Sequence, residues 1–180
     1  GGAGVHPGTM RAGTLGKRCG GGPTAEGDKA SVLAARTLVE KDPDYTYAAA
    51  RLLLQTICKE VLGRDLPQSE MAQSYADYFP GFIKRGVDAE LLDEKLLQFD
   101  LPRLGAALKA DRDLQFDYLG LQTLYDRYFL HIDEQRIELP QAFYMRVAMG
   151  LPLNQIDTGA AGIESYEVIS GLDCRSRPPA

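Results

Sequence analysis

The sequence of 180 residues has little of the chemistry on which many enzymes and nucleic-acid-binding proteins depend. It contains no tryptophan, two histidines and three cysteines. Its net charge of −5 at pH 7 argues against a protein that follows nucleic-acid phosphates, because such proteins are basic. No apolar run approaches the roughly 20 residues that a membrane-spanning helix needs. We therefore expect neither a nucleic-acid partner nor a membrane partner.

The rare residues do not form a recognisable reactive set. The cysteines Cys19, Cys58 and Cys174 are odd in number and widely spaced, so they form neither a disulfide framework nor a paired metal site. His6 and His131 have no Ser–His–Asp or HExxH context. The first residues lack the apolar run of a secretory signal, so we expect free thiols and a cytoplasmic location. We predict no catalytic residue and no metal site in this chain.

Composition changes sharply near residue 30. Residues 1–30 contain 10 of the 19 glycines, and their large aliphatic residues are only Val5, Met10 and Leu15. Such a segment cannot bury enough apolar surface to offset the entropy lost on ordering. It is predicted to be disordered.

Helical periodicity begins after this segment and is clearest over residues 45–62. Apolar residues there recur three or four positions apart, which is typical of an amphipathic helix. Asp44 is a candidate N-cap and Gly63 a candidate C-cap. The remaining pattern predicts helices over 30–40, 70–79 (capped by Ser69 and broken or kinked by Pro80), 80–85, 88–98, 101–108 (capped by Asp100), 116–126, 141–151 and 157–170.

The rest of the pattern completes a mainly α fold with one small β-hairpin. Strand-like residues 128–132 and 136–139 flank a turn, and residues 110–113 read as a charged loop. The helix after Pro140 is apolar on most sides, so we expect it to be buried. The predicted core comprises Leu53, Ile57, Leu92, Leu96, Leu104, Leu119, Leu124, Phe143 and Val147.

Two cations on the strongest helix are the candidate ligand-binding residues. Arg51 and Lys59 could together contact the phosphates of a nucleotide. From spacing alone, the favoured interpretation is that these two cations are solvent-exposed or form salt bridges. Between them, Cys58 reads as a small buried apolar residue rather than as a nucleophile.

Three segments, 33–63, 82–130 and 138–151, together resemble the N-terminal part of the large, catalytic subunit of class I ribonucleotide reductase. The most specific elements are Pro-Asp-Tyr-x-Tyr-x-x-Ala-Arg, from Pro43 to Arg51, and Asp-Arg-Asp-Leu-x-Phe-x-Tyr, from Asp111 to Tyr118. A weaker match continues through residues 163–173, so the resemblance covers about residues 31–173.

The resemblance implies an oxidoreductase that makes deoxyribonucleotides for DNA synthesis. In that family a radical-bearing small subunit generates a thiyl radical on the large subunit, and two further cysteines are re-reduced by thioredoxin or glutaredoxin. These cysteines lie in a ten-stranded barrel that follows the region matched here. Cys174 lies too early to be one of them, and Ser176–Ala180 do not match the expected phosphate-holding loop. The chain is therefore expected to be a fragment, without the barrel and inactive alone; a truncated or frameshifted gene is one hypothesis.

The resemblance also implies a division of the chain. Residues 1–30 show no resemblance, 31–66 correspond to the end of an ATP cone, 67–173 to the helical domain before the barrel, and 174–180 to an irregular tail. The implied effector of the cone is ATP or dATP, which would regulate the enzyme allosterically, and Lys59 falls at a nucleotide-contacting position. No other cofactor is expected.

The implied partners are the small subunit, a second large subunit and nucleotides. Because the helix over 141–150 packs against the rest of the large subunit in that family, we expect an exposed apolar face here and self-association. The alternative is a non-enzymatic helical module that mediates interactions or binds nucleotide weakly.

Overall fold

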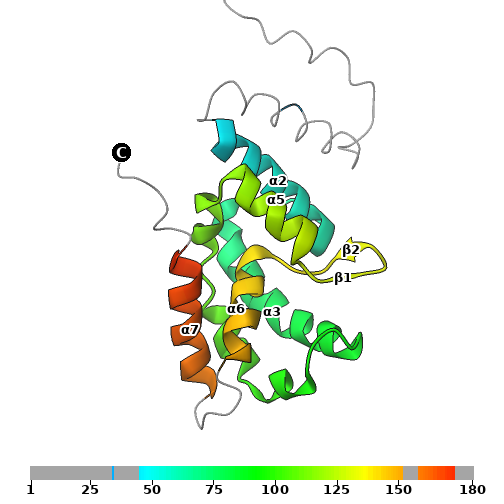
Figure 1. The fold of residues 1–180 in the computed structure, drawn as a ribbon, viewed down its shortest axis with the longest axis vertical. Coiled ribbons are helices and arrows are strands. Elements are labelled where there is room, and N and C mark those ends of the chain that lie inside the picture. The colour runs from blue at the N-terminus through cyan, green and yellow to red at the C-terminus, as the bar shows by residue number, and fades with distance from the viewer. Residues whose placement is uncertain (1–33, 35–44, 152–157, 173–180) are drawn as a thin grey trace, which may run out of the picture.

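The computed structural model describes residue 34 and residues 45–151 and 158–172. This part is helical apart from one two-stranded hairpin, as the sequence predicts (Figure 1). The predicted helix over 30–40, the Asp44 cap, the disorder of residues 1–30 and the tail 174–180 lie outside the described residues. Within the described part, no helix is both long enough and apolar enough to cross a membrane.

The helices are α2 (Tyr45–Leu62), α3 (Met71–Asp88), α4 (Leu101–Ala106), α5 (Tyr118–Arg127), α6 (Pro140–Gly150) and α7 (Thr158–Leu172). Short 3-10 helices connect them: η1 (Gln68–Glu70), η2 (Glu94–Gln98) and η3 (Ala110–Gln115). The hairpin strands are β1 (His131–Ile132) and β2 (Gln135–Arg136), paired antiparallel.

Helix α2 has the bounds predicted for it. It ends at Gly63, whose positive φ of 72° is easily adopted by glycine and whose N–H donates to the carbonyl oxygen of Lys59 at 2.9 Å. Its buried face packs beside α5 (Figure 1). The hydroxyl of Thr46 accepts a hydrogen bond from the N–H of Tyr118, which joins the N-terminal ends of the two helices.

Helix α3 corrects the prediction of separate helices over 70–79 and 80–85 on either side of Pro80. The helix continues through Pro80 to Asp88, although proline supplies no N–H for the carbonyl of Ala76. The aromatic side chains on either side, those of Phe79 and Phe82, are buried, so tertiary packing outweighs the lost bond. The predicted Ser69 cap is also wrong, because Ser69 lies inside η1.

The predicted amphipathic helix over 88–98 is wrong. After α3 the chain turns, with a positive φ of 58° at Glu90, and the N–H groups of Leu91 and Leu92 both donate to the carbonyl of Gly86. The Asp93 side chain then accepts from the N–H of Lys95 and starts η2. The chain turn after α3 ends the first element, and capping by Asp93 in the middle of the predicted helix begins a separate short one.

Two further predictions are corrected in the following segment. The charged loop over 110–113 is the 3-10 helix η3, in which Asp113 is buried with only 3% of its surface exposed. Helix α5 begins at Tyr118 rather than at Phe116, because Asp117 caps it by accepting from the N–H of Gly120 at 2.6 Å. The predicted cap at Asp100 is confirmed: its side chain accepts from the N–H of Arg103 and starts α4.

The hairpin is present but shorter than predicted. The N–H groups of Tyr128 and Phe129 donate to the carbonyl of Leu124, so these residues complete the end of α5 instead of starting a strand. Asp133 and Glu134 both have positive φ, which is the conformation of the two-residue turns that suit a twisted hairpin.

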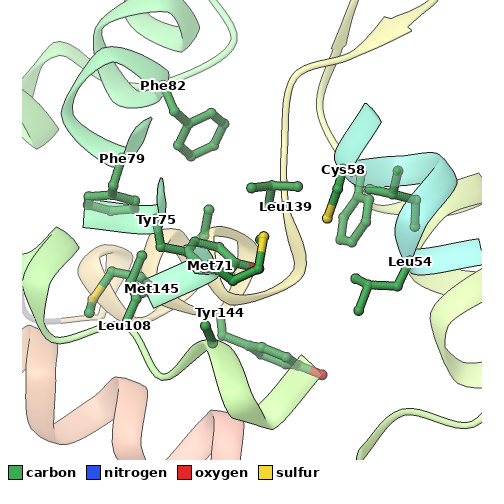
Figure 2. Packing of buried hydrophobic residues seen from close by; sticks show 14 of the residues in the cluster. Leu54, Cys58, Met71, Tyr75, Phe79, Phe82, Leu108, Leu139, Tyr144 and Met145 are labelled. Carbon is green, nitrogen blue, oxygen red and sulfur yellow. The ribbon is translucent and has the colours of Figure 1, made fainter. Parts of the chain in front are cut away.

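The core lies between α3, α6 and their neighbours. Figure 2 shows the α3 side chains of Tyr75 and Phe79 in the same buried cluster as Leu139 and Met145. Helix α6 is buried, as predicted, and packs mainly on α7. The exposed apolar face expected of this helix is mostly covered by the rest of the chain, and among its large apolar residues only Phe143 and Val147 stay partly exposed. The expected self-association stays a prediction.

Most of the predicted core residues lie in this core or against it. Leu53, Ile57, Leu96 and Leu104 are buried, and Leu92, Leu124 and Phe143 pack against the buried residues while partly exposed. Val147 is only half-buried. Leu119 is wrong, with 72% of its surface exposed, because α5 buries the face carrying Tyr118 and Leu121.

Candidate functional site

Helix α2 carries both residues predicted to contact nucleotide. Arg51 and Lys59 are eight residues apart, which separates them by about 12 Å along a helix axis. Arg51 is exposed and lines a cleft, whereas Lys59 is half-buried near the end of the helix and lies outside the cleft lining. The structure therefore does not bring the two cations onto one wall, and their shared role stays a prediction.

The cleft beside α2 has a volume of about 670 Å³, which is in the range of small-molecule sites. One wall is α2, and the other is the connection to α3. This connection is held in place by Gln68, whose side-chain amide donates to the carbonyl of Ala110 at 3.1 Å. The residues that line the cleft are Arg51, Leu52, Leu54, Gln55, Thr56, Cys58, Asp65, Leu66, Pro67, Gln68, Met71 and Leu114.

Cys58 forms part of the cleft wall without being reactive. Its side chain is 6% exposed, and burial raises the pKa of the thiol to about 12. The thiol is therefore protonated at neutral pH, which makes it a poor nucleophile. The prediction that Cys58 acts as a small buried apolar residue is confirmed.

A second polar site is fully internal and centres on Asp113. Its two carboxylate oxygens accept hydrogen bonds from the hydroxyl of Tyr75, at 2.6 Å, and from the side-chain amide of Gln141, at 2.8 Å. The backbone N–H of Gln141 donates to the same Tyr75 hydroxyl at 3.2 Å. Burial raises the pKa of Asp113 to about 7, although both hydrogen bonds oppose that rise. Three elements, α3, η3 and α6, thus meet at one buried carboxylate.

The same network extends to α7 through Tyr166. The Tyr166 hydroxyl donates to the side-chain oxygen of Gln141 at 2.7 Å and accepts from the backbone N–H of Lys109 at 2.8 Å. Nearer the surface, Glu167 forms salt bridges with both Lys109 and Arg112. These bonds hold the pKa of the Glu167 carboxyl below its usual value. Helix α7 is therefore fastened by the buried hydrogen bonds of Tyr166, by the more exposed salt bridges of Glu167, and by a hydrogen bond that the Arg112 guanidinium donates to the Ser170 hydroxyl.

A buried ion pair fixes the start of α6. Glu138 is fully buried; its carboxylate accepts from the Arg146 guanidinium at 2.8 Å and from the N–H of Leu130 at 2.8 Å. Burial raises the pKa of Glu138, while Arg146 opposes that rise. Because both carboxylate oxygens are engaged, the pair serves to join the hairpin region to α6.

Glu60 makes the corresponding connection between α2 and the hairpin. Its carboxylate accepts from the Tyr125 hydroxyl at 2.7 Å and from the N–H of Arg136 at 2.8 Å. The Arg136 guanidinium lies over the ring of Tyr125, 4.3 Å from its centroid. His131, which has no catalytic motif around it in the sequence, is exposed at the start of this hairpin.

The described residues do not form a reactive centre of a familiar kind. Among them there is no group of three or more His, Cys, Asp or Glu side chains that could hold a metal ion. Every buried side-chain nitrogen and oxygen in the described part has a hydrogen-bond partner. The arrangement can therefore hold helices together, and the cleft can accept a ligand, but the internal network offers no unpaired acid or base.

The sequence reasoning missed Asp113, Tyr75 and Gln141 as a set. The signal available in the sequence was the spacing of three between Ala110, Asp113 and Phe116. The structure shows that all three are buried. A spacing of three places residues on one face of a 3-10 helix. The partners on α3 and α6 lie 38 and 28 residues away, and no local pattern links them.

Comparison with known proteins gives consistent matches. Residues 114–174 match the family model of the all-alpha domain of ribonucleotide reductase. The chain is 45% identical over 141 residues to the ribonucleoside-diphosphate reductase subunit alpha of Chlamydia muridarum, covering 78% of this chain and 14% of that protein. It is 34% identical over 149 residues to the subunit alpha of Helicobacter pylori strain 26695, covering 80% and 18% respectively.

A eukaryotic relative gives a similar picture. The chain is 32% identical over 147 residues to the ribonucleoside-diphosphate reductase large subunit of Danio rerio, covering 82% of this chain and 18% of that protein. The chain thus spans less than a fifth of the length of these relatives, and the match lies in their N-terminal region.

Proposed function

We propose, from its homology to the N-terminal region of ribonucleotide reductase large subunits, a supporting role for this chain. It acts as a helical, non-catalytic part of an enzyme that reduces ribonucleoside diphosphates. The homology confirms the resemblance seen in the sequence. The reaction itself is a proposal, because the matched region is a small part of each relative.

The observation that carries this proposal is the internal use of the buried polar groups. In the described part, each buried side-chain nitrogen and oxygen bonds to another group of the same helical body. The described cysteine, Cys58, is buried with its thiol protonated. A reductase that works through thiyl radicals and disulfide exchange needs accessible, reactive thiols. The described helices are therefore better suited to supporting a catalytic region than to carrying out catalysis themselves.

The partners follow from the same homology. The names of the relatives, subunit alpha and large subunit, support assembly with other subunits. We propose the radical-bearing small subunit and a second large subunit as the partners, nucleotides as ligands of the assembled enzyme, and the cytoplasm as the location.

The first experiment measures reduction directly. The purified chain is mixed with a small subunit, a thioredoxin system and a ribonucleoside diphosphate, and deoxyribonucleotide is quantified by chromatography. We expect none above background, while the intact subunit alpha of a relative provides the positive control. Deoxyribonucleotide whose formation depends on this chain would contradict the proposal.

The second experiment tests the supporting role. The chain is added to a relative's subunit alpha from which the corresponding N-terminal region has been deleted. We expect partial recovery of reductase activity. A Leu104→Asp variant, which places a charge at a fully buried position, should give no recovery, whereas Leu119→Asp at an exposed position should behave as the wild type. Lack of recovery with a folded, bound chain would count against the supporting role.

Nucleotide binding at the α2 cleft is the second candidate function. It is favoured by the exposed Arg51 on the lining of a cleft of suitable volume. Isothermal titration with ATP and dATP tests it, with Arg51→Ala and Lys59→Ala as the informative variants and Lys95→Ala on η2 as the matched control. If the cleft binds nucleotide, we expect weak binding that Arg51→Ala reduces and Lys95→Ala preserves, and the absence of detectable binding excludes this second function. Tight binding that is lost in Lys59→Ala would instead support a working ATP cone.

A further inference from the structure

The cleft beside α2 has a buried apolar floor and an exposed rim. Leu54 and Cys58 from α2 and Met71 from α3 belong to the floor, and all three are buried. Figure 2 shows Leu54 and Cys58 on the side of α2 that faces Met71. Leu52 and Pro67 add apolar surface at the rim, where both are exposed. Such a floor stabilises the apolar part of a ligand, because both surfaces leave water when they meet.

The charged side chains of the cleft lie at its opposite ends. Arg51, Gln55 and Cys58 follow one face of α2, and about 10 Å of helix axis separates Arg51 from Cys58. The pKa of the Cys58 thiol is raised mainly by burial and further by the charges of Asp113 and Asp65, so Asp65 lies near this thiol. One end of the cleft is therefore positive and the other is negative.

The positive end offers hydrogen-bond donors that the described part of the chain does not use. The side chains of Arg51 and Gln55 are exposed and one helical turn apart, and among the described residues no side-chain hydrogen bond or ion pair engages either of them. Thr56 and Gln68, in contrast, already donate to backbone carbonyl oxygens, at 3.0 Å and 3.1 Å. A guanidinium beside an amide suits one carboxylate group, because both can donate to its oxygens.

We propose that the cleft is a binding site for an amphiphilic carboxylate, a small molecule with one acidic end and an apolar body. The carboxylate contacts Arg51 and Gln55, and the apolar body lies over Leu54 and Met71. Asp65 disfavours a second negative charge at the far end of the ligand. The inference goes beyond the supporting role proposed above and does not rest on it.

The same charges set this ligand apart from a nucleotide. Among the described residues that line the cleft, Arg51 is the one cation, and Asp65 carries the opposite charge. A nucleoside triphosphate brings several negative charges, which a single exposed cation does not balance. A ligand with one negative charge therefore complements the lining better than ATP does.

The test is isothermal titration of the full chain with four probes: octanoate, hexanoate, octan-1-ol and octanedioate. Octanoate should bind about fivefold more tightly than octan-1-ol, as expected for one ion pair with an exposed cation. It should bind about tenfold more tightly than hexanoate, because two more methylene groups are buried. Octanedioate, which has a carboxylate at each end, should bind more weakly than octanoate. ATP is added as a competitor and should displace octanoate poorly.

Three variants at exposed positions locate the site without disturbing the core. Arg51→Gln should weaken octanoate binding about fivefold and leave octan-1-ol binding unchanged. Asp65→Asn should strengthen the binding of octanedioate more than that of octanoate, because the second carboxylate no longer meets a negative charge. Lys95→Gln on η2 is the matched control and should bind all four probes as the wild type does.

The inference is wrong if octanoate does not bind, or if it binds no better than octan-1-ol. It is equally wrong if Arg51→Gln behaves as Lys95→Gln does, or if Asp65→Asn leaves the preference for octanoate over octanedioate unchanged. ATP binding tighter than octanoate binding would contradict it and favour the nucleotide site instead. The recovery of reductase activity is a separate measurement, so failure of the supporting role is distinguishable from failure of this site.

Discussion

A glycine at the contact between α3 and α4 provides the sharpest test of the packing. Gly105 lies where Pro80 leaves the carbonyl of Ala76 without its helical donor. A Cβ atom at Gly105 would lie 3.1 Å from that carbonyl oxygen and 3.2 Å from the Cβ atom of Phe79. Both neighbours belong to α3, and Phe79 is fully buried, so neither can move freely. Gly105→Ala should therefore destabilise the protein.

The magnitude follows from two opposing effects. Replacing glycine by alanine inside a helix stabilises by about 0.5–1 kcal/mol, because alanine loses less backbone entropy. Overpacking a tight contact costs about 1–3 kcal/mol. We expect a net loss of about 1 kcal/mol for Gly105→Ala, and a larger loss for Gly105→Val, whose two γ-carbons enter the same space.

Gly81→Ala on α3 is the matched control. Nothing lies within 4 Å of a Cβ atom at Gly81, so only the entropic gain should remain and the variant should be stabilised. Urea unfolding is followed by far-ultraviolet circular dichroism, because the chain has no tryptophan for fluorescence. If Gly105→Ala stabilises the protein as much as Gly81→Ala does, the close approach of α4 to α3 is not as described and the reasoning fails.

Three further predictions use the same unfolding assay or amide exchange. Leu104→Ala should cost about 2–5 kcal/mol because Leu104 is fully buried, whereas Leu119→Ala, at a side chain 72% exposed, should change stability by no more than about 0.5 kcal/mol; similar losses for both would refute the assigned core. Arg146→Ala should cost about 3–5 kcal/mol because it leaves the buried Glu138 carboxylate without its ion pair. Since burial raises the pKa of Glu138, this loss should grow as pH rises through the raised pKa and shrink in acid, and a pH-independent loss would contradict it. Amide exchange should be slowest in the central helix α3, whose aromatic side chains are buried; faster exchange there than in α5 would place the stable core elsewhere.

Local sequence patterns correctly predicted the elements whose ends are set by residues close to them in the sequence. The bounds of α2, the Asp100 cap and the apolar helix α6 all follow from spacing, capping residues and proline placement. The same rules failed at Pro80, where packing of flanking aromatic residues overrides a local penalty. They failed again at Asp93, where a mid-pattern cap competes with helical periodicity.

The candidate site was less accessible to sequence reasoning. Arg51 was found because its charge stands out on a periodic helix, and the structure places it on the cleft. Asp113 was read as part of a solvated loop, because charged residues are usually exposed. Its partners Tyr75 and Gln141 come from helices that are distant in the sequence.

The sequence by itself determined the helical class, the homology to reductase large subunits and most of the apolar positions that are buried. These properties depend on local periodicity and on the identity of residues in short motifs. Only the tertiary structure decided which polar residues are internal, that Gly105 permits α4 to approach α3, and that α7 is joined to the body through Gln141. The physical reason is that burial and hydrogen-bond direction are properties of pairs of residues brought together by folding, and neither is encoded in the spacing of residues along one helix.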